Sequence, residues 1–404
     1  MNRAALKARA CAEVDALRPA MDAVAHAIHD DPEVGWETPR SAARLEDFLE
    51  AEGMAVERDV VGLPCAFRAA GTAAAGGGHP AVAFLAEYDA LPKVGHGCGH
   101  NLIGATACGA GIAVSRILAA AGLPGTAYVM GTPFEEGGGG KIVLLERGVF
   151  DGVDASLMFH PGTGGEVRAG SPNNACHFMT FRYYGKAAHT GAAPWEGVNA
   201  ADAAMFFFAA VNALRQHLTA DVRVSGVIRE GGESAGIVPD YAEVPMPVRG
   251  RSYRSILPVI EKVKDCARAG ALATGCRLEI DEGPTFLEHV LLDSYRALVN
   301  ESLPEMGVPP IAGVGPHVTA SADSGNISQK LPHLTLGLPI EMRKDVALHT
   351  TAFAAAADSD LGRDAMNRAA KVLAMCALDL IAEPERLAAI RAEHRAKTTA
   401  AAAG

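Results

Sequence analysis

Five short clusters of histidine, cysteine and acidic residues in this chain could do chemistry. The densest is the loop 96–101, His-Gly-Cys-Gly-His-Asn, in which Cys98 and His100 would face the same side of an extended chain. Thiolate and imidazole suit zinc, and imidazole also suits other transition metals. A glycine-rich turn with a buried cysteine and a hydrogen-bonded histidine would read the same way, because the spacing is not that of a standard zinc finger. This cluster alone does not favour metal binding over a structural turn.

The second cluster is the acidic pair Glu135 and Glu136, followed by four glycines and Lys141. Adjacent carboxylates can divide the work, since one can bind a metal while the other takes a proton from a metal-bound water. The run superficially resembles a phosphate loop, but Ile142 stands where that motif needs serine or threonine. Acidic residues are also common at solvated helix N-termini, and alone the pair favours that interpretation.

Three histidines complete the set of candidates. His160 ends the apolar run 155–159, His189 lies in a glycine-rich loop, and His349 precedes a C-terminal helix. The turn-like segment upstream of His349 contains Asp323, which could orient it. Each histidine has an ordinary alternative as a core or loop residue. The first four clusters, however, each follow a predicted strand, where ligands usually bind in α/β sheets.

The elements that position these residues predict an α/β sheet covered by helices. From residue 173 the pattern changes to β-α-β-β-α-β, which is typical of a ferredoxin-like unit. After residue 288 the helix-and-loop pattern of the first segment returns. We therefore expect an α/β domain (1–172 plus 289–404) interrupted by an α+β insert (173–288). The first 60 residues are expected to be helical. Further strands are predicted at 81–92, 126–131, 155–162, 173–184, 222–229, 242–251 and 276–281, and helices at 39–53, 102–121, 198–218 and 255–271.

Composition narrows the class of protein. The net charge of −11 over 404 residues disfavours nucleic acid as a partner, because phosphate contacts need clustered Lys and Arg. The most apolar stretch, 102–114, looks too short and too glycine-rich to span a membrane. The N-terminus indicates a helix and not a signal peptide. Eight cysteines without a CxxC pair or framework spacing predict reduced thiols and a cytoplasmic location.

Taken together, eight ordered motifs resemble the M20 metallopeptidase and amidohydrolase family, in the branch of the aminobenzoyl-glutamate hydrolases and M20-domain-containing protein 2. The resemblance covers nearly the whole chain. The motifs are AEYDALP (86–92), GHGCGHN (95–101), FEEGGGGK (134–141), FHPG (159–162), GKAAHTGAAPWEGVNA (185–200), IVPD (237–240), SADSGNIS (321–328) and LHTTAF (348–353).

The resemblance implies a zinc-peptidase-like α/β catalytic domain with an inserted ferredoxin-like lid, and a homodimer formed through the lid. It implies one or two divalent ions, Zn or Mn, and hydrolysis of an amide bond in a small N-acyl or N-aroyl amino acid or dipeptide by a metal-bound hydroxide. Glu135 would be the general base, and His189 of the lid, usually the partner's, would stabilise the oxyanion. The implied metal ligands are Cys98, His100, Glu136, His160 and His349.

Some positions depart from the family pattern. Glu87-Tyr88-Asp89 stands where many relatives have His-x-Asp, and we expect Asp89 to orient ligands. Asn101 replaces an aspartate that usually lies at or beside the metals. Gly236 replaces an asparagine that commonly holds the substrate carboxylate.

Two residues are expected to bind substrate, and the first of them could replace that asparagine. They are Arg249, for which a strand salt bridge is an equal alternative, and Asn199. Two other functions stay open: a hydrolytic deaminase or other C–N hydrolase acting on an aromatic amine, and a binding module without turnover. The intact Glu135, Glu136 and His189 disfavour the second.

Overall fold

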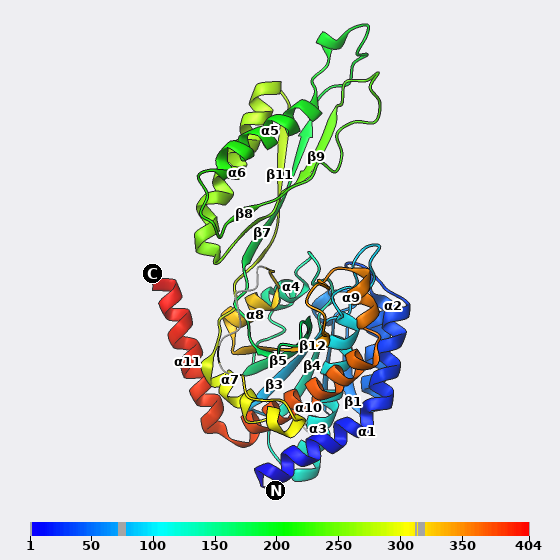
Figure 1. Cartoon of the computed structure of the whole chain (residues 1–404), viewed down its shortest axis with the longest axis vertical. Coiled ribbons are helices and arrows are strands. Elements are labelled where there is room, and N and C mark those ends of the chain that lie inside the picture. The colour runs from blue at the N-terminus through cyan, green and yellow to red at the C-terminus, as the bar shows by residue number, and fades with distance from the viewer. Residues whose placement is uncertain (1, 72–77, 312, 314–319, 404) are drawn as a thin grey trace. The chain divides into compact units, whose positions relative to one another are not determined.

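The computed structural model describes residues 2–71, 78–311, 313 and 320–403, and it divides the chain into two compact units (Figure 1). The first unit contains the described residues up to 172, from 289 to 313, and from 326 onward. The second contains 173–288 and 320–325. We expected the segment 320–325 in the catalytic domain. It groups with the second unit instead, where Asn174 N donates to Ala320 O at 2.9 Å.

A seven-stranded sheet in the order β1-β2-β4-β3-β5-β12-β6 forms the centre of the first unit. Strands β3, β4, β5 and β12 are parallel neighbours, and β3 is buried along its whole length, as the unbroken apolar run predicts. We expected only helix before residue 60, so β1, paired antiparallel with β2, corrects that prediction. The strands are β1 Met54–Arg58, β2 Phe67–Gly71, β3 Ala81–Ala86, β4 Thr126–Gly131, β5 Ala155–Thr163, β6 Arg168–Ala169 and β12 His333–Glu341.

Helices α1, α3 and α10 pack against one another, and α3 and α10 also contact the sheet. Their buried side chains belong to one continuous apolar core with the strands. The helices of this unit are α1 Arg3–Asp30, α2 Pro39–Ala51, α3 His100–Ala121, α4 Gly140–Glu146, α7 Asp293–Asn300, α9 Thr351–Ala356, α10 Asp360–Ala382 and α11 Pro384–Ala403; α8, Ser324–Lys330, starts at the boundary. Short 3₁₀ turns lie at Val60–Gly62, Pro194–Glu196 and Leu303–Met306.

Helix α3 extends beyond the apolar stretch 102–114 that we expected to be too short to span a membrane. Its 22 residues are long and apolar enough to cross a membrane by length and composition, although we expected the stretch to be too short. However, 83% of its most apolar window is buried within the protein. Core packing therefore accounts for its composition.

The expectation of reduced thiols concerns eight cysteines. All eight are free in the structure. The cytoplasmic location stays a prediction.

The second unit has the strand and helix order of a ferredoxin-like fold, with a sheet ordered β11-β7-β10-β8 and β9 also paired to β7. We predicted one strand over 242–251, but the structure has two, because prolines at 245 and 247 cannot donate ladder hydrogen bonds. The elements are β7 Ala175–Tyr184, α5 Ala200–Arg215, β8 Arg223–Val224, β9 Tyr241–Pro245, β10 Val248–Gly250, α6 Tyr253–Thr274 and β11 Arg277–Phe286.

Candidate metal centre

Four parallel strands of the first unit bring their carboxyl ends to one edge of the sheet. Glu87 and Asp89 follow β3, the acidic pair follows β4, and His349 follows β12. His160 lies inside β5, which continues to Thr163 and so is longer than predicted. Parallel strands present their following loops together, which explains why residues far apart in the sequence meet here.

Two glycines allow the loops to approach the cluster. Gly99 precedes α3 with φ of 77°, and a Cβ there would lie 2.5 Å from Cγ of Pro161, the residue after His160. At Gly140 a Cβ would lie 1.7 Å from the carbonyl oxygen of Pro133. A side chain at either position would push apart the loops that carry the candidate ligands.

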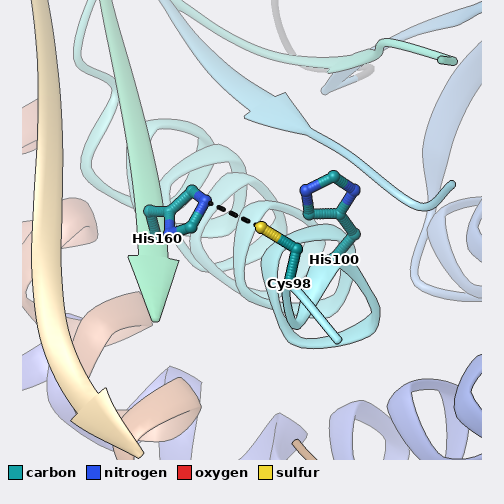
Figure 2. A group of neighbouring side chains, drawn as sticks. All are labelled: Cys98, His100 and His160. Atoms are coloured by element: carbon teal, nitrogen blue, oxygen red, sulfur yellow. Dashed lines mark hydrogen bonds between the residues drawn. The ribbon is translucent and has the colours of Figure 1, made fainter. Parts of the chain in front are cut away.

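All five predicted ligands converge in the structure. Figure 2 shows the Cys98 thiol directed at His160, with Sγ 3.6 Å from Nε2, and the His100 ring beside them. Potential ligand atoms form three groups, each within 4.8 Å. The groups are Cys98 with His100 and His160, Cys98 with Glu136 and His349, and His100 with Glu135 and Glu136.

Hydrogen bonds fix which ring nitrogen faces the cluster. The Nδ1 of His100 donates to the Asp89 carbonyl oxygen at 2.9 Å, and the Nδ1 of His160 donates to the Pro161 carbonyl oxygen at 2.9 Å. Each Nε2 then directs a lone pair into the cluster, which is how metal-binding histidines are usually held. Burial lowers the pKa of His160, which favours the neutral ring that a metal needs.

Two buried acceptors meet where a cation would stabilise them. The Nε2 of His100 lies 3.9 Å from Oε1 of Glu136, and neither atom has a hydrogen-bond partner among the described residues. The Nε2 of His349 lies 3.5 Å from the same oxygen. Buried polar atoms are normally satisfied, so this arrangement fits a bound cation. Burial raises the pKa of the Cys98 thiol, so its ionisation depends on such a cation.

Asp89 contacts the proposed ligands His100 and Glu136, and its expected role in orienting them stays a prediction. One carboxylate oxygen lies 3.1 Å from Nδ1 of His100, and the other accepts from the backbone N of Glu136 at 3.0 Å. We expect Asp89→Asn to weaken divalent metal binding by about 10- to 100-fold, the usual loss for such a partner. Competition with a chromogenic chelator would measure it. An affinity within twofold of wild type, in a protein with unchanged circular dichroism, would contradict this role.

Sequence reasoning missed two residues of the centre, Glu87 and Lys141. The Lys141 ammonium lies 2.6 Å from Oε1 of Glu87, whose Oε2 lies 3.4 Å from Nε2 of His100. Burial alone would raise the pKa of Glu87, but the charge of the Lys141 ammonium opposes it, and that pKa lies below its usual value. The available signal was the placement of Glu87 two residues before Asp89, on the same side of an extended chain.

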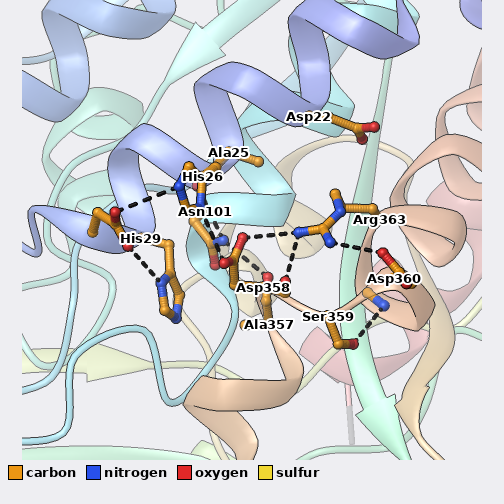
Figure 3. A network of polar contacts seen from close by, with 12 residues as sticks. Asp22, Ala25, His26, His29, Asn101, Ala357, Asp358, Ser359, Asp360 and Arg363 are labelled. Atoms are coloured by element: carbon orange, nitrogen blue, oxygen red, sulfur yellow. Dashed lines mark hydrogen bonds and ion pairs between the residues drawn. The ribbon is translucent and has the colours of Figure 1, made fainter.

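Asn101 does not join the cluster, which corrects our expectation of a position beside the metals. Figure 3 shows its side chain directed toward α1 and the end of α9, where Nδ2 donates to the carbonyl oxygens of Ala25 (3.2 Å) and Ala357 (3.1 Å). Successive residues of a helix point about 100° apart. Because α3 begins at His100, the next side chain turns away and ties helices together.

His189 belongs to the second unit and is exposed, with a defined tautomer. Its Nδ1 accepts from the backbone N of Gly191 and of Ala192, both at 3.1 Å. The remaining ring nitrogen, Nε2, therefore carries the proton and is a ready hydrogen-bond donor.

The other predicted residues of the second unit have local partners. Asn199 caps α5 by accepting from Ala201 N at 2.9 Å, a role that accounts for it without a substrate. Asp323 is buried in the segment that groups with this unit, and its action on His349 stays a prediction. Arg249 on β10 donates to Ser321 Oγ at 3.4 Å, and no carboxylate among the described residues pairs with it.

Comparison with known proteins identifies the family. A model of the peptidase dimerisation domain matches residues 177–274, within the second unit. The Xaa-Arg dipeptidase of Mus musculus is 38% identical over 403 residues, which cover 97% of this chain and 93% of the mouse protein. The chain belongs to the M20 peptidase family.

Other relatives agree with the M20 assignment. One of the p-aminobenzoyl-glutamate hydrolase subunits of Escherichia coli (strain K12) is 34% identical, over 72% of this chain and 64% of its own length. A dinuclear metal-binding peptidase of the M20 family from Bacillus subtilis shares the fold, with a TM-score of 0.63 at 21% identity, covering 91% of this chain and 99% of that one. The predicted family and fold are therefore confirmed, and this M20 chain is a hydrolase of C–N bonds.

Proposed function

We propose that the protein hydrolyses the amide bond of a small N-acyl amino acid or dipeptide at a centre held by Cys98, His100, Glu136, His160 and His349. The observation that carries this proposal is the convergence of these five side chains, with Nε2 of His100 and Oε1 of Glu136 left facing each other. Relatives named as a dipeptidase and as amide hydrolases support amides as the substrates over aromatic amines.

The charge of the centre supports a pair of divalent cations. With the thiol ionised, the centre contains five negative charges and the positive ammonium of Lys141. The negative groups are Cys98, Glu87, Asp89, Glu135 and Glu136. Four negative charges remain, which two divalent cations would neutralise. The mixture of sulfur, nitrogen and oxygen donors suits Zn or Mn. When bound, such ions polarise a carbonyl group and make a water molecule more acidic.

Two side chains would carry the proton and the developing charge. Glu135 lies directly before the proposed ligand Glu136 and is buried, so its carboxylate can take the proton of the attacking water and pass it to the leaving nitrogen. His189 would donate its Nε2–H to the developing oxyanion. We propose that it acts from the second unit of a partner copy, as the resemblance implies.

We propose that Arg249 binds the substrate carboxylate. Its guanidinium has no acidic partner among the described residues and lies 5.8 Å from the ring centroid of Phe178. Arg249→Met should raise KM at least tenfold for a free-acid substrate, because a charge-assisted pair is lost, while kcat changes less. Steady-state kinetics on the acid and its carboxamide measures this.

The carboxamide is the internal control for Arg249. Its KM should not respond to Arg249→Met, and Arg254→Met, at an exposed arginine of α6, should leave both substrates unaffected. Equal effects of Arg249→Met on acid and carboxamide would contradict carboxylate binding.

We propose a homodimer formed through the second unit. The match to the dimerisation domain supports it, and that unit also exposes large apolar side chains that a partner could cover. These are Trp195, Met205, Phe206 and Leu272.

The decisive experiment is a substrate screen with metal-loaded protein. Release of free amine would be measured from Xaa-Arg dipeptides, aminobenzoyl-glutamate and N-acyl amino acids, with Zn or Mn, and with Glu135→Gln as the blank. Turnover of one class that the blank lacks supports the proposal. No turnover of any member at metal saturation would overturn it.

A further inference from the structure

The ion pair between Glu87 and Lys141 is unusual because both side chains are removed from solvent. Their exposed fractions are 1% and 0%, and Nζ lies 2.6 Å from Oε1. Burying two charges is costly even when they are paired, and removing one partner leaves an uncompensated buried charge. A contribution to folding stability therefore does not by itself explain why this ion pair is buried.

The pair is built into the centre by its surroundings. Glu87 directly follows β3, and its second oxygen lies 3.4 Å from Nε2 of His100, the nitrogen not bound by Asp89. Lys141 stands in the first turn of α4, directly after the four glycines that follow Glu135 and Glu136. The Lys141 ammonium and the proposed ligand Glu136 therefore belong to the same segment, the one that follows β4.

We propose that Glu87 is a further carboxylate of the metal centre and that Lys141 is its internal counter-cation, a positioning residue that holds Glu87 toward His100 and limits the negative charge left for metal ions. This inference rests on the proposed metal centre. Lys141 would keep the carboxylate-rich centre folded when metal is absent, and it would set the affinity with which metal is bound.

The test measures metal binding and not turnover. Metal-free wild type, Glu87→Gln, Lys141→Met and the double variant would be titrated with Zn²⁺ by calorimetry, with metal content per chain and thermal unfolding measured in parallel. Glu87→Gln should bind metal at least about tenfold more weakly, since it loses a carboxylate and leaves an unpaired ammonium beside the ligands.

Lys141→Met should behave in the opposite way. Its metal-free form should unfold at a lower temperature, its affinity for Zn²⁺ should rise, and saturating Zn²⁺ should raise its unfolding temperature more than that of wild type. The double variant should recover metal-free stability and lose the gain in affinity, because coupled partners do not give additive effects.

A matched control is Lys7→Met. Lys7 is a comparably buried lysine of the same unit, and it bonds Ser302 and Asp379 at 2.9 Å, outside the cluster. It should lose stability equally with and without metal. If Lys141→Met behaves like Lys7→Met, or if Glu87→Gln binds Zn²⁺ as wild type does, the inference is wrong. A wild type that binds no divalent ion would instead refute the proposed function.

Discussion

Glu135→Gln should lower kcat by about 10²- to 10⁴-fold, the range that a positioned general base contributes. Glutamine keeps the size and hydrogen bonding of the side chain but cannot take a proton from water. Because Glu135 adjoins Glu136 without being one of the five proposed ligands, metal content should stay at the wild-type level. Initial rates and metal analysis on the same preparation measure both quantities.

Two further variants make this prediction specific. Glu136→Gln should lose metal as well as activity, and Glu146→Gln, at the exposed end of α4, should change neither. If Glu135→Gln retains a rate within a few-fold of wild type, another group is the base. If it loses its metal, Glu135 is a ligand.

His189→Ala should lower kcat by about 10²- to 10³-fold, the effect of removing one donor to an oxyanion. The fixed tautomer makes this expectation firm, since two backbone N–H groups hold Nδ1 and leave Nε2–H to donate. KM should change little, because the bond forms mainly in the transition state.

The control for His189 is His217→Ala, an exposed histidine in the same unit. It should keep wild-type kinetics. A mixed dimer would combine one His189→Ala subunit with one Glu135→Gln subunit. If His189 acts on the site of its partner, one of the two sites in this dimer contains both an intact Glu135 and an intact His189. Recovery of activity on mixing would show this, and its absence would place His189 in the same chain as its site.

Much of the fold, and the residues that converge at the candidate site, could be predicted from the sequence. Buried parallel strands leave continuous apolar runs, and the loops after them carry the histidines and carboxylates. The match of several ordered motifs then favoured ligation over the ordinary alternatives that each cluster allowed alone.

The remaining features depended on tertiary structure. Glu87 and Lys141 are 54 positions apart, so their pairing requires the end of β3 and the start of α4 to meet in the fold. The side chains of His100 and Asn101 point in different directions because the two residues are neighbours in a helix. Which of them faces the cluster depends on the residue at which α3 begins. Strand β1 is mostly exposed and carries no long apolar run. Its sequence therefore resembled the end of the preceding helix.

The placement of His349 gives the centre a mechanical role. Its backbone N donates to the Gly97 carbonyl oxygen at 2.8 Å, and its side chain is 53% exposed, whereas Cys98 and His100 are buried. A cation shared by Cys98 and His349 would close a chain loop of about 250 residues that includes the whole second unit. The cation would act as a reversible cross-link between the two halves of an interrupted domain. His349 would be its most accessible ligand, because that side chain is the most exposed.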